Sequence, residues 1–321
     1  MLAIRVERPG GPDVLTAADV PVPAPGAGQV LVKVAAAGIN FIDTYQRSGL
    51  YKVPLPFTLG QEASGTVEAS GAGVAGLAPG DRVAYTGALG AYAEHAVVPA
   101  DRLVKLPAGL SFDLAAAAML QGMTAHYLAT TTCALAPGKT CLVHAAAGGV
   151  GLLLVQMAKR KGALVIGTTG SEEKARLARE AGTDHVILYR TEDVPARVKE
   201  ITAGRGVDVV YDGVGKATFD ASLQCVAPHG LLAMFGNASG AVPPFDVLRL
   251  QDNARYLARP RLGEHIASRH DLEWRAGEVL GWIADGTLKV RIHRKYPLRE
   301  AAEAHRDLES RATSGKLLLV P

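Results

Sequence analysis

Residues 142–151 read LVHAAAGGVG, and this stretch decides the fold of the chain. Its apolar start is typical of a buried strand, and the glycines that follow are typical of a tight turn. Residues 152–161 then have the apolar spacing of a helix. A strand, a glycine turn and a helix in this order bring backbone N–H groups and the positive helix end together, where a dinucleotide pyrophosphate can bind. The stretch therefore predicts a dinucleotide-binding unit.

The glycine pattern departs from G-x-G-x-x-G at its first position, which is Ala146 here. The missing Cβ atoms of Gly148 and Gly149 let a phosphate approach the backbone, and Gly151 lets the helix pack close to the strand. A glycine turn also occurs in α/β proteins that bind no nucleotide, so its context carries the argument. Residues 164–169, LVIGTT, are a second strand-like run one helix later, at the spacing of a β-α-β unit.

The end of this second run predicts which dinucleotide binds. NAD sites usually carry Asp or Glu there, whereas this chain has Gly170 and Ser171, with Lys174 following. Small residues leave room for a 2′-phosphate and a lysine neutralises it, so we expect NADPH. Ser171 also fits as a helix N-cap, and Glu172 and Glu173 in the first turn argue against a bound phosphate. The alternative for Lys174 is an ordinary solvated lysine.

Size and composition set the frame for these motifs. With 321 residues, of which 48% are hydrophobic, the chain suits two domains. No apolar run approaches the roughly 20 residues of a membrane span, and the first residues lack the layout of a signal peptide. The three cysteines have no paired spacing, so we expect buried thiols and a cytoplasmic location. A net charge of +3 predicts no strongly charged partner.

The character of the sequence changes near residue 110. Before it, short strand-like runs such as 29–34 and 63–69 are separated by Pro and Gly, which is typical of a partly closed β domain. After it, helices alternate with apolar runs, and residues 207–212 and 230–236 are predicted to be buried parallel strands. The apolar run at 317–320 is expected to return to the first domain. These patterns predict an α/β chain in which a doubly wound parallel sheet is combined with a strand-rich domain.

Several motifs occur in one order along nearly the whole chain. They are AGINFIDTY at 37–45, LGQE at 59–62, GDRV at 80–83, QGMTAHY at 121–127, the turn at 145–151, FGNASG at 235–240 and ESRAT at 309–313. In these motifs the chain resembles the zinc-independent quinone oxidoreductases, the zeta-crystallin-like branch of the medium-chain dehydrogenase/reductases. The resemblance implies a GroES-like catalytic domain, residues 1–124 and 263–321, with an inserted Rossmann domain, residues 125–262. It also implies NADPH and a homodimer, for which residues 254–259 are the expected edge strand.

The zinc ligands of the zinc-dependent relatives are the feature that this branch lacks. Those enzymes bind zinc through an early cysteine and through the histidine of a Gly-His-Glu segment. Here residues 38–43 contain no cysteine, residues 60–62 read Gly-Gln-Glu, and residues 84–94 lack the cysteines of a structural zinc lobe. Since zinc needs thiolate or imidazole ligands at close spacing, we expect no metal. The substrate should then accept a hydride unaided, as a quinone or a conjugated carbonyl compound does.

The resemblance also implies the residues of a substrate cleft and of a cofactor site. The cleft positions are matched by Asn40, Asp43, Tyr45, Tyr51, Thr124 and Tyr127. The cofactor positions are matched by Asn40, Tyr127, Ala147, Gly148, Gly149, Val150, Gly151, Gly170, Ser171, Lys174, Tyr189, Phe235, Asn237, Ser239, Gly240 and Arg311. Asparagine and tyrosine side chains can hydrogen-bond a substrate oxygen, and no single general acid is assigned.

Structural roles remain open for some of these residues. Tyr51 lies in an expected loop, Asp43 can serve only as a helix cap, and Arg311 can be a solvated cation. Gly213 stands where relatives often carry Ser or Asn, so a hydrogen bond to the cofactor is expected to be missing there.

Two alternative functions remain open. One is an NADPH-dependent enone or enoyl-thioester reductase, which would use the same cofactor turn and a similar metal-free pocket. The other is an RNA-binding or structural, crystallin-like role, for which the basic residues between 289 and 295 are the candidate surface. Such a cluster is usually a solvated face, and the near-neutral total charge gives no support for nucleic acid as a partner.

Overall fold

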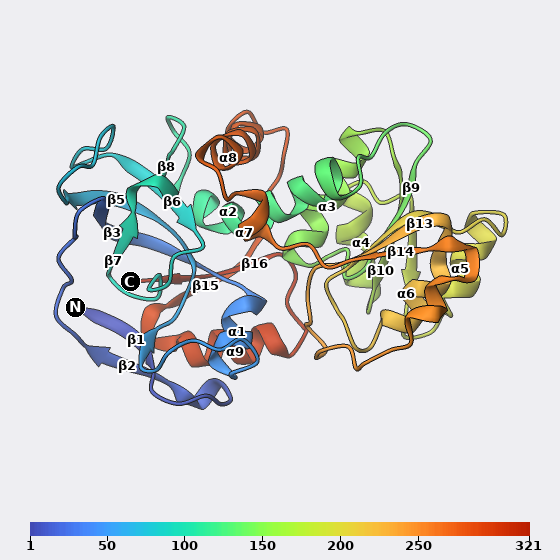
Figure 1. Cartoon of the computed structure of the whole chain (residues 1–321), viewed down its shortest axis with the longest axis horizontal. Coiled ribbons are helices and arrows are strands. Elements are labelled where there is room, and N and C mark those ends of the chain that lie inside the picture. The colour runs from blue at the N-terminus through green and yellow to red at the C-terminus, as the bar shows by residue number, and fades with distance from the viewer. The chain divides into compact units, whose positions relative to one another are not determined.

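The computed structural model describes all 321 residues, which form two compact units (Figure 1). Unit 1 consists of Met1–Met123 and Ile266–Pro321, and unit 2 consists of Thr124–His265. Unit 2 is thus an insertion in the sequence of unit 1, and it begins one residue before and ends three residues after the predicted insertion at 125–262. No helix combines the length and the apolar character that crossing a membrane requires.

Unit 1 is strand-rich. A three-stranded sheet has the order β2-β1-β4, and a seven-stranded sheet has the order β15-β16-β3-β5-β6-β8, with β7 also paired to β3. The strands are β1 (Leu2–Val6), β2 (Leu15–Asp19), β3 (Gln29–Ile39), β4 (Phe57–Thr58), β5 (Glu62–Ser70), β6 (Arg82–Thr86), β7 (His95–Pro99), β8 (Val104–Lys105), β15 (Ile292–Pro297) and β16 (Lys316–Val320). As predicted, the C-terminal strand β16 returns to the first strands of the chain, because Leu318 pairs with Gly38 in β3.

The core of unit 1 consists mainly of Val, Leu, Ile and buried Tyr side chains of its strands, and among the helices only α9 contributes to it, through Ala301 and Ala304. The helices of unit 1 are α1 (Phe41–Arg47), α8 (Arg269–Ala284) and α9 (Ala301–Glu309), and α2 (Phe112–Tyr127) begins in this unit. Short helical turns are η1 (Pro12–Val14), η2 (Ala100–Arg102) and η6 (Leu298–Glu300).

Unit 2 contains one six-stranded sheet in which every pairing is parallel, in the order β11-β10-β9-β12-β13-β14. The strands are β9 (Thr140–Val143), β10 (Leu164–Thr169), β11 (His185–Leu188), β12 (Val207–Asp212), β13 (Val226–Met234) and β14 (Tyr256–Ala258). The helices are α3 (Gly149–Arg160), α4 (Glu172–Glu180), α5 (Val194–Ile201), α6 (Phe219–Cys225) and α7 (Leu262–His265), with η3 (Leu128–Thr132), η4 (Val247–Leu250) and η5 (Asp252–Ala254).

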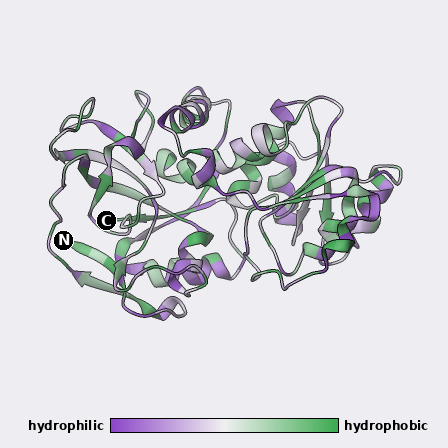
Figure 2. Cartoon of the chain, viewed as in Figure 1, coloured by the Kyte–Doolittle hydropathy of each residue, from purple (hydrophilic) through white to green (hydrophobic).

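The order of the parallel strands reverses between β9 and β12, which are neighbours in the sheet. In open α/β sheets, ligands bind beyond the carboxyl ends of the strands at such a point. Figure 2 shows hydrophobic colouring along β9 and α3, whereas α5 and α8 carry much hydrophilic colouring. The predicted fold class, a doubly wound parallel sheet combined with a strand-rich unit, is confirmed.

Candidate functional site

The glycine turn of unit 2 begins where β9 ends. Ala145 has a φ of 51°, and Gly148 is the N-cap of α3. A Cβ atom on Gly151 would lie 2.3 Å from the carbonyl oxygen of Ala145, so only glycine allows the helix to start this close to the strand. The first turn of α3 carries no acidic side chain. Its backbone N–H groups and its positive dipole end therefore suit a dinucleotide pyrophosphate.

Positive charge gathers where β10 ends, beside the N-terminus of α4. The hydroxyl of Ser171 caps α4 by accepting a hydrogen bond from the N–H of Lys174 at 3.4 Å. Burial lowers the pKa of Lys174, and the nearby guanidinium of Arg190 lowers it further. A Cβ atom on Gly170 would lie 2.6 Å from the hydroxyl of Tyr189, so that hydroxyl lies over the glycine. Two cations and two hydroxyls at this strand end fit a phosphate monoester.

Glu172 and Glu173, whose negative charge argues against a bound phosphate, both have basic neighbours in the structure. The carboxylate of Glu172 lies 3.6 Å from the guanidinium of Arg179, about two turns further along α4. Glu173 faces Lys174 closely enough to raise its pKa slightly against the two lowering effects. Arg190 had no signal in the sequence pattern, because its place beside Lys174 depends on the parallel pairing of β10 with β11.

The loops that follow β12 and β13 are joined by hydrogen bonds. The N–H of Ser239 donates to the carbonyl of Val214 at 2.7 Å, and its hydroxyl donates to the same carbonyl at 2.8 Å. That hydroxyl also accepts from the N–H of Ala217 at 2.9 Å. A Cβ atom on Gly213 would lie 2.8 Å from the ring of Phe235, which explains the glycine at this position.

The other residues predicted for these loops lie in the same segment. With its amide turned to satisfy both neighbours, Asn237 donates to Gly236 at 3.0 Å and accepts from Arg259 at 3.1 Å. Gly240 has a φ of 108°, which favours glycine at this turn.

Asn40 is the N-cap of α1 in unit 1, and both the nitrogen and the oxygen of its side-chain amide have hydrogen-bond partners. Its Nδ2 donates to Oε2 of Glu62 at 2.8 Å and to the carbonyl of Gly38 at 3.2 Å. Its Oδ1 accepts from Nζ of Lys316 at 2.7 Å and from the amide of Gln121 at 3.3 Å. The side chain is 3% exposed. The orientation of Asn40 is therefore fixed by the protein, and its role toward a substrate stays a prediction.

Lys316 and Glu62 form a buried ion pair beside Asn40, with side chains that are 1% and 0% exposed. Burial lowers the pKa of Lys316, and the carboxylate of Glu62 opposes this effect. The other carboxylate oxygen of Glu62 accepts a hydrogen bond from the N–H of Leu120 in α2. A Cβ atom on Gly38 would lie 2.3 Å from this carboxylate, so the glycine makes room for it. Neither Lys316 nor Glu62 was among the predicted site residues.

Asp43 completes a capping box with Asn40, because its Oδ2 accepts from the N–H of Asn40 at 2.8 Å. Burial raises the pKa of Asp43 to about 7. The same oxygen accepts from the hydroxyl of Tyr92 at 2.9 Å. That hydroxyl also lies 3.2 Å from Nε2 of His305, whose pKa burial and the neighbouring Arg47 lower to about 3. Asp43 thus has the helix-capping role, and its place in a substrate cleft stays a prediction.

A group of polar side chains in unit 1 connects α1 to α9. Arg47 lies 2.9 Å from Nδ1 of His305 and binds Glu309 through two hydrogen bonds of 3.1 and 2.7 Å. Arg47 and His305 are buried, and together with Tyr92 they anchor the helix that carries Tyr45. Bidentate arginine–carboxylate geometry gives this link a defined orientation.

The predicted tyrosines of unit 1 form a ring pair. Tyr45 is 8% exposed and Tyr51 is 37% exposed, and their ring centroids lie 5.3 Å apart in an edge-to-face arrangement. The N–H of Tyr51 donates to the carbonyl of Tyr45 at 2.9 Å, which closes the turn after α1. Arg311, also in unit 1, is exposed after α9 with a φ of 59°. Its predicted contact with a phosphate stays a prediction.

Thr124 and Tyr127 open unit 2, on the last turn of α2. Thr124 is 6% exposed, and Tyr127 is 2% exposed with its ring stacked on His265 at 4.1 Å. His265 also lies 3.4 Å from the hydroxyl of Thr131. No local pattern marks His265, since it lies more than a hundred residues from its ring partner Tyr127.

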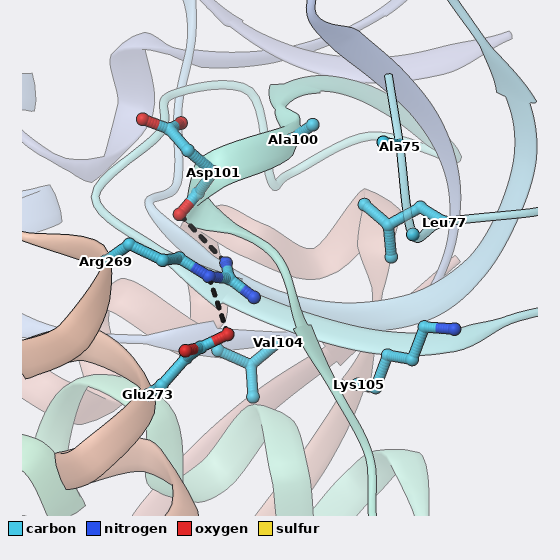
Figure 3. Close-up of a pocket in the computed structure, with 9 residues that line it drawn as sticks. Ala75, Leu77, Ala100, Asp101, Val104, Lys105, Arg269 and Glu273 are labelled. Carbon is cyan, nitrogen blue, oxygen red and sulfur yellow. Dashed lines mark hydrogen bonds and ion pairs between the residues drawn. The ribbon is translucent and has the colours of Figure 1, made fainter.

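Two further features bear on the chemistry. No group of three or more His, Cys, Asp or Glu side chains is arranged to hold a metal ion, while independence from metal stays a prediction. A cavity of about 680 Å³ in unit 1 (Figure 3) contains none of the predicted site residues. Its Arg269 is engaged by the carboxylate of Glu273 at 2.8 Å and by the carbonyl of Asp101 at 3.0 Å. We assign this cavity no part in the site.

Comparison with known proteins places the chain in a family. Residues 26–108 match the alcohol dehydrogenase GroES-like domain, as predicted, and residues 149–274 match the family described as zinc-binding dehydrogenase. A quinone oxidoreductase of Pseudomonas aeruginosa is 48% identical over 97% of both chains. A 2-haloacrylate reductase of a Burkholderia species is 40% identical over 100% of this chain and 99% of the relative. The solved structure of Escherichia coli quinone oxidoreductase complexed with NADPH is 46% identical over the whole of both chains, with a TM-score of 0.98. The chain therefore belongs to the quinone oxidoreductases of the medium-chain dehydrogenase/reductase superfamily.

Proposed function

We propose that this protein reduces quinones with NADPH, without a metal ion. The observation that carries the proposal is the pair of cations at the end of β10, where Lys174 and Arg190 lie together and no carboxylate takes the position of an NAD-specific acid. The NADPH bound to the Escherichia coli relative supports the cofactor, and the names of the full-length relatives support the substrate class.

Each unit has its own task in this proposal. Unit 2, the Rossmann domain, binds the pyrophosphate at the N-terminus of α3 and the 2′-phosphate beside Ser171. The loop at 235–240 orients the nicotinamide, which supplies a hydride when the cofactor is bound. Unit 1, the GroES-like domain, presents the ring pair of Tyr45 and Tyr51 to the substrate. Asn40 contributes an amide whose direction Lys316 and Glu62 already fix, so no reorganisation is needed during the reaction.

The chemistry of quinones explains why these groups suffice. Delocalisation stabilises the charge that arrives with the hydride, so neither a Lewis acid nor a strong general acid is required. The protein has to bind, orient and exclude water, which buried aromatic rings and a prearranged amide can do. The proton that completes the hydroquinone can come from solvent or from a tyrosine hydroxyl.

The test is turnover of purified protein with NADPH or NADH against 1,4-benzoquinone and against a conjugated enone, before and after exhaustive dialysis with a chelator. We expect NADPH-dependent quinone reduction that survives chelation. Reduction of the enone alone would favour the alternative reductase, for which the 2-haloacrylate reductase relative is the supporting observation. Stoichiometric zinc in active, dialysed protein would overturn the metal-free part of the proposal.

A nucleic-acid role receives no support from the basic residues of β15. Arg294 lies 3.3 Å from Glu303 and 3.6 Å from Asp307, and Lys295 lies 2.8 Å from Asp113. Acidic neighbours therefore reduce the positive potential that a phosphate backbone would need.

A homodimer and a cytoplasmic location are the remaining parts of the proposal. The strand β14 is an edge of the unit 2 sheet, and Tyr256 on it is 59% exposed. Val247 and Leu248, in the preceding segment, are 68% and 66% exposed. Pairing of two β14 edges would cover the unpaired backbone groups. The three free cysteines suit a reducing compartment.

A further inference from the structure

A chain of buried hydrogen bonds crosses unit 2 beneath the carboxyl ends of its strands. The hydroxyl of Thr168 lies 3.0 Å from Nδ1 of His144, and Nε2 of His144 lies 2.9 Å from the hydroxyl of Ser222. The hydroxyl of Ser222 in turn donates to Oδ2 of Asp212 at 2.7 Å. All four side chains are buried, and they come from β10, the residue after β9, α6 and β12.

The direction of these hydrogen bonds follows from the carboxylate end. The carboxylate of Asp212 only accepts, so the proton of Ser222 points to it and the oxygen of Ser222 must accept from Nε2–H of His144. His144 is then the neutral tautomer whose Nδ1 accepts from Thr168. Burial lowers the pKa of His144, which keeps the ring in this neutral form. Each hydrogen bond of this series, from Thr168 to Asp212, therefore has one donor and one acceptor.

Asp212 fixes the turn that follows β12. Its Oδ1 accepts from the N–H groups of Val214 at 2.8 Å and Gly215 at 3.0 Å, and its Oδ2 also accepts from the hydroxyl of Thr218 at 2.7 Å. The carbonyl of Val214 accepts both hydrogen bonds of Ser239. One buried carboxylate thus holds the turn at 213–215 and, through it, the loop at 235–240.

The other end of the chain holds the glycine turn. His144 directly precedes that turn, and its N–H donates to the carbonyl of Tyr211 at 3.1 Å. Thr168 contacts the turn region twice, because its carbonyl accepts from the N–H of Ala146 at 3.0 Å and its hydroxyl binds His144. The pyrophosphate turn and the loops after β12 and β13 are therefore tied to one set of side chains.

We propose that Asp212 and His144 are positioning residues that couple the pyrophosphate turn to the loops at 213–215 and 235–240, so that both ends of the cofactor are held in one arrangement. This inference rests on the proposed function. Nucleophilic catalysis by Ser222 and His144 is a different interpretation, and the geometry opposes it. Asp212 accepts from the serine rather than from the histidine, and Ser222 is 0% exposed.

The test breaks the chain at two links and compares a matched control. Thr168→Val and Ser222→Ala each remove one hydroxyl of the chain. Thr183→Val removes a hydroxyl of similar burial, 6% exposed, which has no hydrogen-bond partner in the structure. Hydrogen exchange is measured on protein without cofactor, over residues 145–151 and 235–240. We expect both chain variants to exchange about three- to tenfold faster in both segments, and the control to match wild type.

Cofactor affinity gives a second readout, by fluorescence titration of NADPH and of NADH without quinone. The chain variants should weaken both cofactors by a similar factor of about three to ten, because the coupled loops serve parts that the two cofactors share. Lys174→Ala should weaken NADPH alone. Asp212→Asn, which keeps the size of the side chain and removes its charge, should have the largest effect on both readouts.

The outcomes separate this inference from the proposed function. If Thr168→Val and Ser222→Ala matched the Thr183→Val control in hydrogen exchange and in cofactor affinity, the positioning role would be overturned. Faster exchange confined to the segment beside the substituted residue would overturn the coupling. If wild-type protein bound no NADPH, the proposed function would fail, and the exchange data would still decide whether the chain couples the loops.

Discussion

The buried ion pair of unit 1 allows a sharp test of how its polar cluster is held. Lys316→Met would remove the ammonium while keeping an unbranched apolar side chain of similar length. The carboxylate of Glu62 would stay buried, with hydrogen bonds from Asn40 at 2.8 Å and from the N–H of Leu120 but without a counter-charge. Removing one partner of a buried pair costs about 3–5 kcal/mol, and the two remaining donors offset part of this. We expect a loss of about 2–4 kcal/mol in the free energy of unfolding.

The assay is urea unfolding followed by tryptophan fluorescence. Both tryptophans, Trp274 and Trp282, lie on α8 in unit 1, so this signal reports the unit that contains the ion pair. The matched control is Lys295→Met, because Lys295 pairs with Asp113 at 2.8 Å with side chains that are 53% and 33% exposed. Exposed pairs contribute about 0–1 kcal/mol, so the control should change little.

A double variant decides whether the charge itself is responsible. Replacing both partners, Lys316→Met with Glu62→Gln, leaves no unpaired charge and should recover most of the lost stability. The reasoning would be refuted if Lys316→Met cost no more than the exposed control. It would also be refuted if the double variant were as unstable as the single one.

Four further predictions concern the cofactor, the substrate, the assembly and pH. Lys174→Ala should weaken NADPH binding by about 1–3 kcal/mol in a fluorescence titration and leave NADH unchanged, and equal losses would contradict the phosphate role. Tyr51→Phe should lower kcat/KM for a quinone about two- to tenfold, through loss of one neutral hydrogen bond, and complete inactivity with intact NADPH binding would reveal an obligatory proton donor instead. Tyr256→Lys should shift the protein to monomers in light scattering, because it places charge on the edge strand, and a wild-type protein already monomeric at micromolar concentration would remove the dimer. Burial raises the pKa of Asp43 to about 7, so the folded protein keeps a proton that the unfolded chain releases, and stability falls as pH rises from about 4 to 7. Asp43→Asn should reduce that loss, and urea unfolding curves of equal pH dependence for variant and wild type would contradict the assignment.

Local patterns in the sequence were sufficient for the elements of the fold but not for their arrangement. The segment at 207–212 is the strand β12, as its Val and Tyr residues predict, because a parallel strand covered on both faces is rich in such side chains. The pairing of β9 with β12 joins segments far apart in the sequence, and no local pattern encodes it. The strand expected at 254–259 is shortened to Tyr256–Ala258, since Asn253 and Ala254 have positive φ values and close a helical turn before it.

The candidate site divides in the same way. Gly151 and Ser171 could be selected from the sequence because a tight turn and a helix cap have local signatures. Arg190 could not, since it meets Lys174 only through the order of the strands. Lys316 stands at the start of an apolar strand and is separated by 254 residues from its partner Glu62, so its burial cannot be predicted from its neighbours.

The two buried polar clusters differ in a way that determines how each can be tested. The carboxylate of Glu62 is paired with one buried cation, Lys316. Removing Lys316 leaves this carboxylate buried without a counter-charge, and the cost of its desolvation is several kcal/mol. Asp212 has no buried cation among its hydrogen-bond donors, which are two backbone N–H groups and two hydroxyls. Removing the hydroxyl of Ser222 therefore leaves three donors on the carboxylate, and Thr168→Val leaves all four. The strands around Asp212 keep their apolar core. Substitutions at Thr168 and Ser222 should accordingly leave unit 2 folded and act on the mobility of its loops, whereas Lys316→Met acts on the stability of unit 1.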